Sequence, residues 1–393
     1  MSRRLRLVLL VVGLAVGLQV PLVAALARLI APAWPVIAVP ALLTAAFVLS
    51  FVRVRSAWAT PGPLRLYLVL WPFFAWWTVS LLFAVVAPVA LAVAYLAGVA
   101  THAALAVGVA VSAAGGALSL RQRPRIRTHE VQISGLPAAF DGYRIAQISD
   151  LHCGPFASGQ RVARWVDAVN RLRPDAIAVT GDLIVSGPDF VPVVASALAG
   201  LRAGDGVFAS MGNHDYFGDG EAMVTALEGA GLTVLRNRGV VVRREGGALY
   251  VAGVDDTWTR RDDLERTLAD RPSAAPVVLL AHDPMLFPQA AARGVDLVLS
   301  GHTHGGQVAI PLLARRLNLA RLITPFTNGV YRSGESMLYV NRGLGTTGPP
   351  VRIAVAPEIA VLVLRRRASR GAEPEPNVSE RLAIHVPPLT SQS

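Results

Sequence analysis

The distribution of charged residues divides this chain into two unlike parts. Residues 1–120 form long apolar runs with few charges, the first acidic residue is Glu130, and all other Asp and Glu follow it. A chain with 53% hydrophobic and 16% charged residues is otherwise compatible with one large domain. We therefore predict a helical membrane anchor over residues 1–127, an α/β domain over residues 128–366 and a disordered tail over residues 367–393.

The apolar runs have the length of membrane-spanning helices. A bilayer core about 30 Å thick needs roughly 20 apolar residues in a helix. Residues 7–27 and 35–52 fit one span each, and residues 66–120 fit two helices that turn near residues 97–102. The sequence thus predicts about four spans and a multi-pass protein of the cell membrane.

Arginines indicate the orientation of these spans. They gather at residues 3–6, 53–65 and 121–127, while the other two connections hold only Arg28 and His102. The positive-inside rule then places both ends, and the α/β domain, in the cytoplasm. The alternative is that Ser2-Arg3-Arg4-Leu5-Arg6-Leu7 is a twin-arginine export signal, which would place the domain outside, but three further spans argue against it.

The basic balance and the cysteine content exclude some classes of protein. The net charge is +11, every basic residue is Arg, and many of these arginines flank the apolar spans, so we attribute the charge to membrane flanks rather than to nucleic-acid binding. The single cysteine, Cys153, excludes an internal disulfide and a Cys-rich zinc module. The fold must rest on its core or on metal ligands other than thiolates.

The second part of the chain alternates strand-like and helix-like segments. Helical periodicity covers residues 159–171, and residues 191–201 and 221–230 look similar. Short apolar runs that end at polar residues predict strands over residues 143–149, 176–180, 207–210, 249–254, 277–281, 297–300 and 337–340. This pattern predicts layered α/β architecture, in which functional side chains gather just beyond the strand ends.

Polar clusters stand at five of these strand ends. Asp150 and His152 lie two residues apart, as do His302 and His304, so an extended backbone would direct each pair to one side. Taken singly, such a His is more often a structural residue, and a Gly-Asp pair is usually a turn. Together, carboxylate, amide and imidazole groups at successive strand ends predict a site for Mn, Fe or Zn. The candidate side chains of these clusters are Asp150, His152, Asp182, Asn213, His214, His282, His302 and His304.

These motifs resemble a known family. The ordered set Asp-x-His, Gly-Asp, Gly-Asn-His-Asp, His and Gly-His-Thr-His resembles the calcineurin-like metallophosphoesterase superfamily over residues 143–364. The longer segments at residues 301–307 and 339–345, with Pro357-Glu358, are similar to a bacterial membrane-associated branch that includes UDP-2,3-diacylglucosamine pyrophosphatases. The resemblance implies a β-sandwich flanked by helices and two divalent metal ions as cofactors. It implies one ion on Asp150, His152, Asp182 and His304, and the other on Asp182, Asn213, His282 and His302.

The resemblance also implies a role for His214. Two neighbouring divalent ions bind phosphoryl oxygens and activate water, so no covalent protein intermediate is needed. By resemblance, His214 is the catalytic residue that is not a ligand and that stabilises the transition state or protonates the leaving oxygen. The family often has an acid three residues after the bridging Asp, where this chain has Val185. Asp215 or a backbone carbonyl is then expected to orient His214.

Three further features carry alternative interpretations. Arg342, in a glycine-rich loop, is predicted either to bind a substrate phosphate or to form a structural salt bridge. Residues 312–326 are either an amphipathic lid that touches lipid or a solvated surface segment. Cys153 is expected to be a bystander rather than a ligand.

Three functions follow as hypotheses. The first is a membrane-anchored hydrolase of phosphoester or pyrophosphate bonds, with membrane lipids and a lipid-linked or nucleotide-sugar lipid substrate as partners. The second is a nuclease, which is disfavoured because the soluble part has no evident basic and aromatic stripe for nucleic acid. The third is a metal-binding membrane protein without catalysis, which would have no need of His214. The sequence gives no indication of the oligomeric state.

Overall fold

The computed structural model describes residues 12–53, 61–120, 123–217, 220–309, 317–367 and 384–385. The chain forms two compact units, Met1–Gln122 with Pro349–Val351 and Arg123–Gly348 with Arg352–Ser393. The start of the first predicted span, the twin-arginine segment and most of the predicted tail lie outside the described residues.

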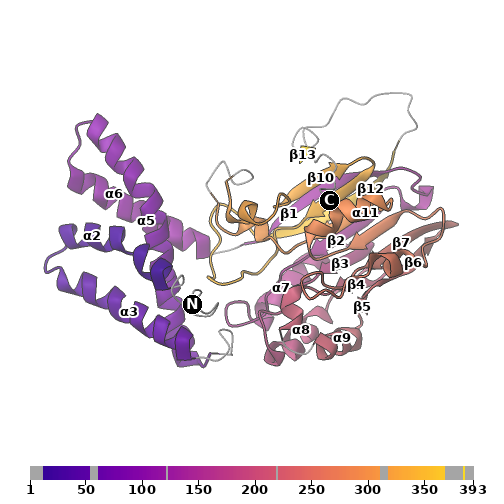
Figure 1. The fold of residues 1–393 in the computed structure, drawn as a ribbon, viewed down its shortest axis with the longest axis horizontal. Helices are drawn as coiled ribbons and strands as arrows, with labels where there is room; N and C mark the ends of the chain where they lie inside the picture. The colour runs from indigo at the N-terminus through magenta and orange to yellow at the C-terminus, as the bar shows by residue number, and fades with distance from the viewer. Residues whose placement is uncertain are drawn as a thin grey trace, which may run out of the picture. The chain divides into compact units, whose positions relative to one another are not determined.

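The first unit is built from apolar helices (Figure 1). They include α2 (Val20–Leu29), α3 (Trp34–Arg53), α5 (Trp71–Leu96) and α6 (Thr101–Leu120). The long apolar run divides between α5 and α6 within the predicted turn. By length and composition, three helical stretches in the described residues can cross a membrane: Val12–Leu29, Pro63–Leu96 and Thr101–Leu120. The apolar part of α3, Trp34–Ser50, is shorter than these three stretches. The fourth membrane span therefore stays a prediction.

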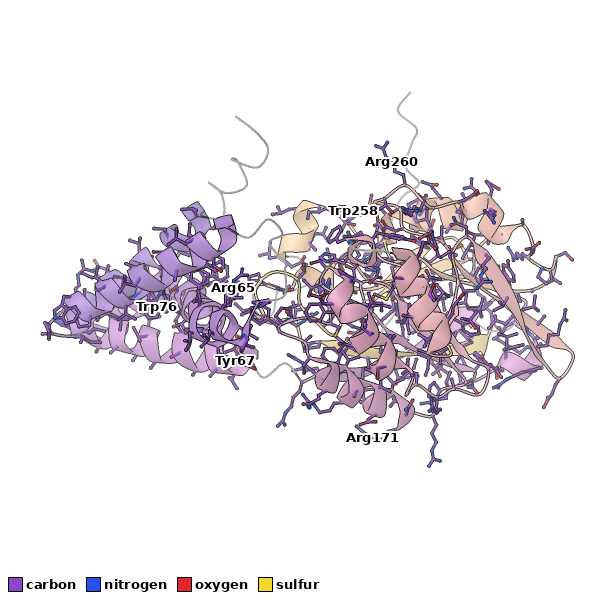
Figure 2. All side chains as sticks on the ribbon, turned by 90° about the horizontal axis from the view of Figure 1, so that it is seen from below. Arg65, Tyr67, Trp76, Arg171, Trp258 and Arg260 are labelled. Carbon is purple, nitrogen blue, oxygen red and sulfur yellow. The ribbon has the colours of Figure 1, made fainter. Side chains whose placement is uncertain are left out.

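A small polar network lies inside this apolar unit. The Gln19 amide donates to Thr44 Oγ1 (2.9 Å), and the Trp76 indole (Figure 2) donates to Gln19 Oε1 (2.7 Å). Gln19 and Thr44 are buried. Polar groups in apolar surroundings are costly unless they are paired, so these bonds tie the start of α2 to α3 and α5.

The second unit contains two β-sheets. In the six-stranded sheet, with order β1-β12-β2-β3-β4-β5, Ile145 pairs with Ala176, and Ile177 with Val207. Its strands are β1 (Arg125–Ile133), β12 (Glu358–Arg366), β2 (Arg144–Ile148), β3 (Ala176–Thr180), β4 (Val207–Ser210) and β5 (Thr233–Val234). The seven-stranded sheet has the order β13-β10-β11-β9-β8-β7-β6. Its strands are β13 (Ile384–His385), β10 (Gly329–Ser333), β11 (Ser336–Val340), β9 (Leu297–Ser300), β8 (Val277–Leu280), β7 (Gly247–Gly253) and β6 (Arg238–Arg244).

Alternation along the strands explains the layers. In β3, Ala176 and Ala178 join a core between the two sheets, whereas Ile177 and Val179 face a core shared with helices. That helical layer contains α7 (Gly159–Asn170), α8 (Val191–Leu198) and α9 (Gly220–Gly229), which lie beside β3, β4 and β5 (Figure 1). The other sheet is covered by α10 (Leu264–Leu268) and α11 (Phe287–Ala292). The predicted β-sandwich flanked by helices is therefore confirmed.

Every predicted strand and helix of this unit is present, with ends shifted by a few residues. The sequence did not predict β1, β5, β6, β10, β12 or β13, and β13 lies within the segment assigned to the tail. Strand β1 begins at Arg125, inside the segment assigned to the anchor, and pairs in parallel with β12. The described part of the residues 312–326 segment contains the short 3-10 helix η7 (Leu319–Leu322), and its role as a lid stays a prediction. Residues 312–316 lie outside the described residues.

Candidate metal centre

The topology brings the five polar clusters to one edge of the sandwich. Strands β2, β3 and β4 are parallel in one sheet, and β8 and β9 are parallel in the other, so their carboxyl ends gather there. Hydrogen bonds between side chains and backbone join the sheets at this edge. Gln147 Nε2 donates to the Ser300 carbonyl (3.0 Å), and the backbone N–H of His302 donates to Asp150 Oδ1 (3.0 Å).

The backbone of the site differs from the extended geometry that the sequence suggested. Five predicted ligands have positive φ angles: Asp150 (51°), His152 (44°), Asp182 (55°), His302 (70°) and His304 (51°). Left-handed backbone is uncommon for residues other than glycine and gathers at functional sites. The side chains of Asp150 and His152, and of His302 and His304, therefore converge because the chain turns sharply beyond each strand.

One ligand group surrounds His304. Its Nε2 lies 3.0 Å from His152 Nε2 and 3.4 Å from Asp150 Oδ1, and His152 Nε2 lies 3.6 Å from Asp182 Oδ2. Asp150, His152 and His304 are buried, and their ligand atoms lie within 4.8 Å of one another. Gly301 packs so closely that an added Cβ would overlap Ser149 Oγ and Asp150 Oδ2.

A second group surrounds Asp182. Its Oδ2 lies 3.2 Å from His282 Nε2, and His302 Nδ1 lies 3.3 Å from that same nitrogen. The His282 Nδ1–H donates to the Thr180 carbonyl (2.7 Å), which leaves Nε2 as the nitrogen that faces Asp182. Asn213 Oδ1 is buried without a hydrogen-bond partner among the described residues. An orphaned amide oxygen beside carboxylates and imidazoles fits a cation site.

Burial and neighbouring charges set the protonation of these groups. Burial lowers the pKa of His152 to about 3, and it also lowers the pKa of His302 and His304. Burial alone would raise the pKa of Asp182, but His282, His214 and His152 together hold that pKa well below its usual range. Neutral imidazoles and an ionised carboxylate are the forms that bind metal ions.

The pKa of His282, which pairs with Asp182, shifts in the opposite direction to those of His152, His302 and His304. Although burial opposes it, the Asp182 carboxylate raises the pKa of His282 well above its ordinary value. The proton on His282 thus compensates a buried negative charge. A divalent cation at this position would satisfy the same charge, so the donor set fits the predicted metal.

The structure shows which group orients His214 and what Asp215 binds instead. His214 Nδ1 donates to the backbone carbonyl of Val185 (2.6 Å), so the carbonyl of this residue takes the place of the usual acid. Asp215 accepts backbone N–H bonds from Asp182 (3.0 Å), Leu183 (2.8 Å) and Gly212 (2.9 Å), and so fixes two of the ligand loops. The His214 ligand atom lies within 4.8 Å of those of His152 and Asp182.

Two arginines lie near the centre in different roles. Arg342 pairs with Glu358 (Nε–Oε2 3.5 Å) and donates to Asn328 Oδ1 (3.1 Å), which matches the structural alternative, and its contact with substrate phosphate stays a prediction. Arg352 was missed by sequence reasoning. Its buried guanidinium donates to the carbonyls of Gly345 (3.0 Å) and His304 (3.3 Å) and lies 3.2 Å from His304 Nδ1. The sequence carries no signal for Arg352, because its apolar neighbours Val351 and Ile353 indicate only a buried segment.

A buried set of carboxylate, amide and imidazole groups at parallel strand ends is the donor set of a metal centre. The comparisons with known proteins agree. The model of the family described as calcineurin-like phosphoesterase matches residues 143–306. The uncharacterized metallophosphoesterase YkuE of Bacillus subtilis is 35% identical over 247 residues, which cover 60% of this chain and 84% of that protein. An uncharacterized metallophosphoesterase of Aquifex aeolicus is 31% identical over 62% of this chain and 93% of that protein.

The chain belongs to the calcineurin-like phosphoesterase family. A protein of Danio rerio named "Transmembrane protein with metallophosphoesterase domain" is 35% identical over 270 residues, which are 65% of this chain. This chain spans 61% of the length of that relative. These comparisons confirm the predicted superfamily.

Proposed function

We propose that this protein is a membrane-anchored, two-metal hydrolase of phosphoester or pyrophosphate bonds in lipid-linked substrates. The observation that carries the two-metal part is that Asp182 lies between two ligand groups, 3.6 Å from His152 on one side and 3.2 Å from His282 on the other. A carboxylate shared in this way suits a bridging ligand.

The proposed ligand sets follow the two groups. The first ion is assigned to Asp150, His152, Asp182 and His304, and the second to Asp182, Asn213, His282 and His302. Mn, Fe or Zn suits this mixture of oxygen and nitrogen donors. Such ions supply Lewis acidity toward phosphoryl oxygens and an activated water.

The protein's own residues orient and neutralise the reacting groups. Because the His214 Nδ1–H is held by the Val185 carbonyl, Nε2 is the nitrogen left to act on the leaving oxygen, and it delivers a proton when the imidazole is protonated on both nitrogens. The backbone N–H of His214 donates to Asp182 Oδ1 (2.9 Å), which couples the position of this imidazole to the shared carboxylate. Arg342 is assigned to a substrate phosphate only if it leaves its ion pair with Glu358.

Membrane attachment supports the lipid-linked substrate. Three helical stretches have spanning length. With α3 as a proposed fourth span, both ends of the chain would lie on one side of the membrane, and the arginine bias favours the cytoplasm. An anchor confines the site near the bilayer and raises the effective concentration of lipid substrates. The resemblance to the bacterial membrane-associated branch makes UDP-linked diacylglucosamine compounds one substrate to assay.

The test is an activity panel on the full chain, purified in detergent and loaded with Mn²⁺. We expect turnover of at least one of a chromogenic phosphomonoester, a chromogenic phosphodiester and a nucleotide-sugar pyrophosphate, and loss of this turnover in Asp182→Asn. The matched control is Asp167→Asn, because Asp167 is an exposed carboxylate on α7. Cleavage of nucleic acid alone would favour the nuclease hypothesis, and bound metal without any turnover would contradict the hydrolase.

The lipid-linked part has its own test in cells. In a strain that carries Asp182→Ala, we expect a lipid-linked phosphate to accumulate, because the variant removes the shared carboxylate and leaves the anchor intact. An unchanged lipid profile, together with normal activity of the unmodified protein on soluble substrates, would contradict the lipid substrate but not the hydrolase.

A further inference from the structure

Exposed apolar side chains of the catalytic unit concentrate around the metal centre. Of the eight large apolar side chains that are exposed within the described part of residues 123–367, only Ile126 and Val193 lie on regular elements away from the site. The other six stand on segments that follow β4, β7, β8 and β9 at the ligand-bearing edge. They are Phe217, Trp258, Met285, Leu317, Leu322 and Ile323.

Five of these residues lie on three neighbouring segments, of which the first contacts His302 and the second follows His282 in the chain. The Trp258 ring packs against the His302 ring, with centroids 5.0 Å apart. Thr257 Oγ1 donates to Asp283 Oδ2 (3.0 Å), and Thr324 Oγ1 donates to Met285 Sδ (3.3 Å). The segment that follows β8 is therefore hydrogen-bonded to the Trp258 loop and to the segment that contains η7. We name this surface the apolar rim, formed by Trp258, Met285, Leu317, Leu322 and Ile323.

The loop that presents Trp258 is held firmly at its base. Asn237 accepts the backbone N–H bonds of Asp255 (2.9 Å) and Asp263 (3.0 Å), and its own amide donates to the Arg261 carbonyl (2.7 Å). The Trp258 side chain nevertheless stays 58% exposed. The Trp258 indole is thus held against a predicted ligand histidine and is still exposed to water. Exposed aromatic side chains held in this way are typical of interaction sites.

Exposure is greater still on the other side of the rim. Leu322 is 84% exposed and Ile323 is 77% exposed. Burial of both side chains in an apolar phase would remove a large apolar area from water. These two residues are therefore the strongest apolar anchors of the catalytic unit.

Arginines are interleaved with the rim. Arg260 and Arg261 follow Trp258, and Arg321 precedes Leu322, and all three are exposed, with Asp262 and Asp263 as the exposed acids of the same loop. Figure 2 shows Trp258 and Arg260 on one side of the catalytic unit and Arg171 on the opposite side. Aromatic and aliphatic residues mixed with arginine are typical of surfaces that sit in a membrane interface with anionic lipids.

We propose that the apolar rim docks on the bilayer surface, so that the metal centre meets phosphate groups of lipids at the headgroup level. A bilayer is favoured over a soluble partner because the same chain carries helices of spanning length, which keep this surface near lipid at a high effective concentration. This inference rests on the proposed function in one respect, because docking is the route by which the proposed lipid-linked substrate would reach the metal centre.

The test measures the depth of single labels on the full chain in liposomes. Cys153 is fully buried, so Leu322→Cys and Arg171→Cys each provide one reactive thiol for a fluorophore. With nitroxide-labelled lipids in anionic liposomes, we expect quenching at position 322 at least about threefold stronger than at position 171. Equal quenching at the two positions would overturn the proposal.

A second variant separates docking from folding and from catalysis. Replacing both anchors, Leu322→Ser with Ile323→Ser, should weaken the quenching of a label placed at Met285→Cys and leave hydrolysis of a soluble chromogenic diester unchanged, whereas Val193→Ser should change neither. Unchanged quenching in the double variant would also overturn the docking proposal. Strong quenching in a protein that hydrolyses none of the panel substrates would contradict the proposed function while docking stands.

Discussion

Replacement of His214 by alanine is a specific test of the site, because the ring and the backbone N–H of His214 have different hydrogen-bond partners. The backbone N–H that donates to Asp182 Oδ1 is retained in His214→Ala, so the shared carboxylate keeps this partner. The ring loses its bond to the Val185 carbonyl and its edge contact with the His152 ring, whose centroid is 4.7 Å away. One such hydrogen bond contributes about 1 kcal/mol to the free energy of unfolding, so the variant should fold.

The effect on turnover should be much larger than the effect on stability. A positioned acid typically contributes about 10²- to 10⁴-fold, which corresponds to about 3–5 kcal/mol in the activation free energy. We expect kcat on a chromogenic phosphodiester to fall by this factor in His214→Ala while metal content per chain is unchanged. His282→Ala is the contrast, since it should lose metal as well as activity.

The assay combines kcat with elemental analysis of the same full-chain samples in detergent. Loss of metal in His214→Ala would show that His214 is a ligand, as its nearness to His152 and Asp182 allows, and would refute the assigned role. Retention of full turnover would refute any part for this imidazole in catalysis.

Three further predictions concern groups around the centre. Gly301→Ala should lower turnover about a hundredfold or more, because its Cβ would displace Ser149 and Asp150, and normal kcat and metal content would contradict this packing. Arg352→Met should lower the free energy of unfolding in urea by about 2–4 kcal/mol, since two buried carbonyls lose their donors, and an unchanged midpoint would contradict it. Burial raises the pKa of the Cys153 thiol to about 12, so alkylation at pH 8 should be about a thousandfold or more slower than for a free thiol until the protein unfolds, and rapid native labelling would contradict this.

Several strands that are buried on both faces were predictable from the sequence, although β12, whose first seven residues are also buried, was not. Strand β3 is a short apolar run followed by Gly181 and Asp182, strand β8 is one followed by Ala281 and His282, and both lie where the sequence predicts them. Strand β1 carries Arg125, Arg127 and Glu130 among its nine residues and gives no such signal. Its place is set by pairing with β12, more than 200 residues away in the sequence, which local patterns do not report.

The candidate site was predictable in composition but not in geometry. The residue types at the strand ends were sufficient to indicate a metal centre, because metal chemistry restricts the ligands. The left-handed backbone at Asp150 and His302 was not predictable from an i, i+2 spacing. Nor was the carbonyl of Val185 as the partner of His214, since a backbone acceptor leaves no trace in the residue type. Arg352 stayed hidden because its partners are carbonyls that only the folded loops bring together.

The most direct test of the central claim is the activity of the full chain as a function of bound Mn²⁺ per chain. After removal of all metal by a chelator, stepwise addition should restore phosphodiester hydrolysis only above about one ion per chain, with a plateau at about two, because the two ligand groups share Asp182. Full activity in the metal-free protein, or a plateau at a single ion per chain, would contradict the two-metal account.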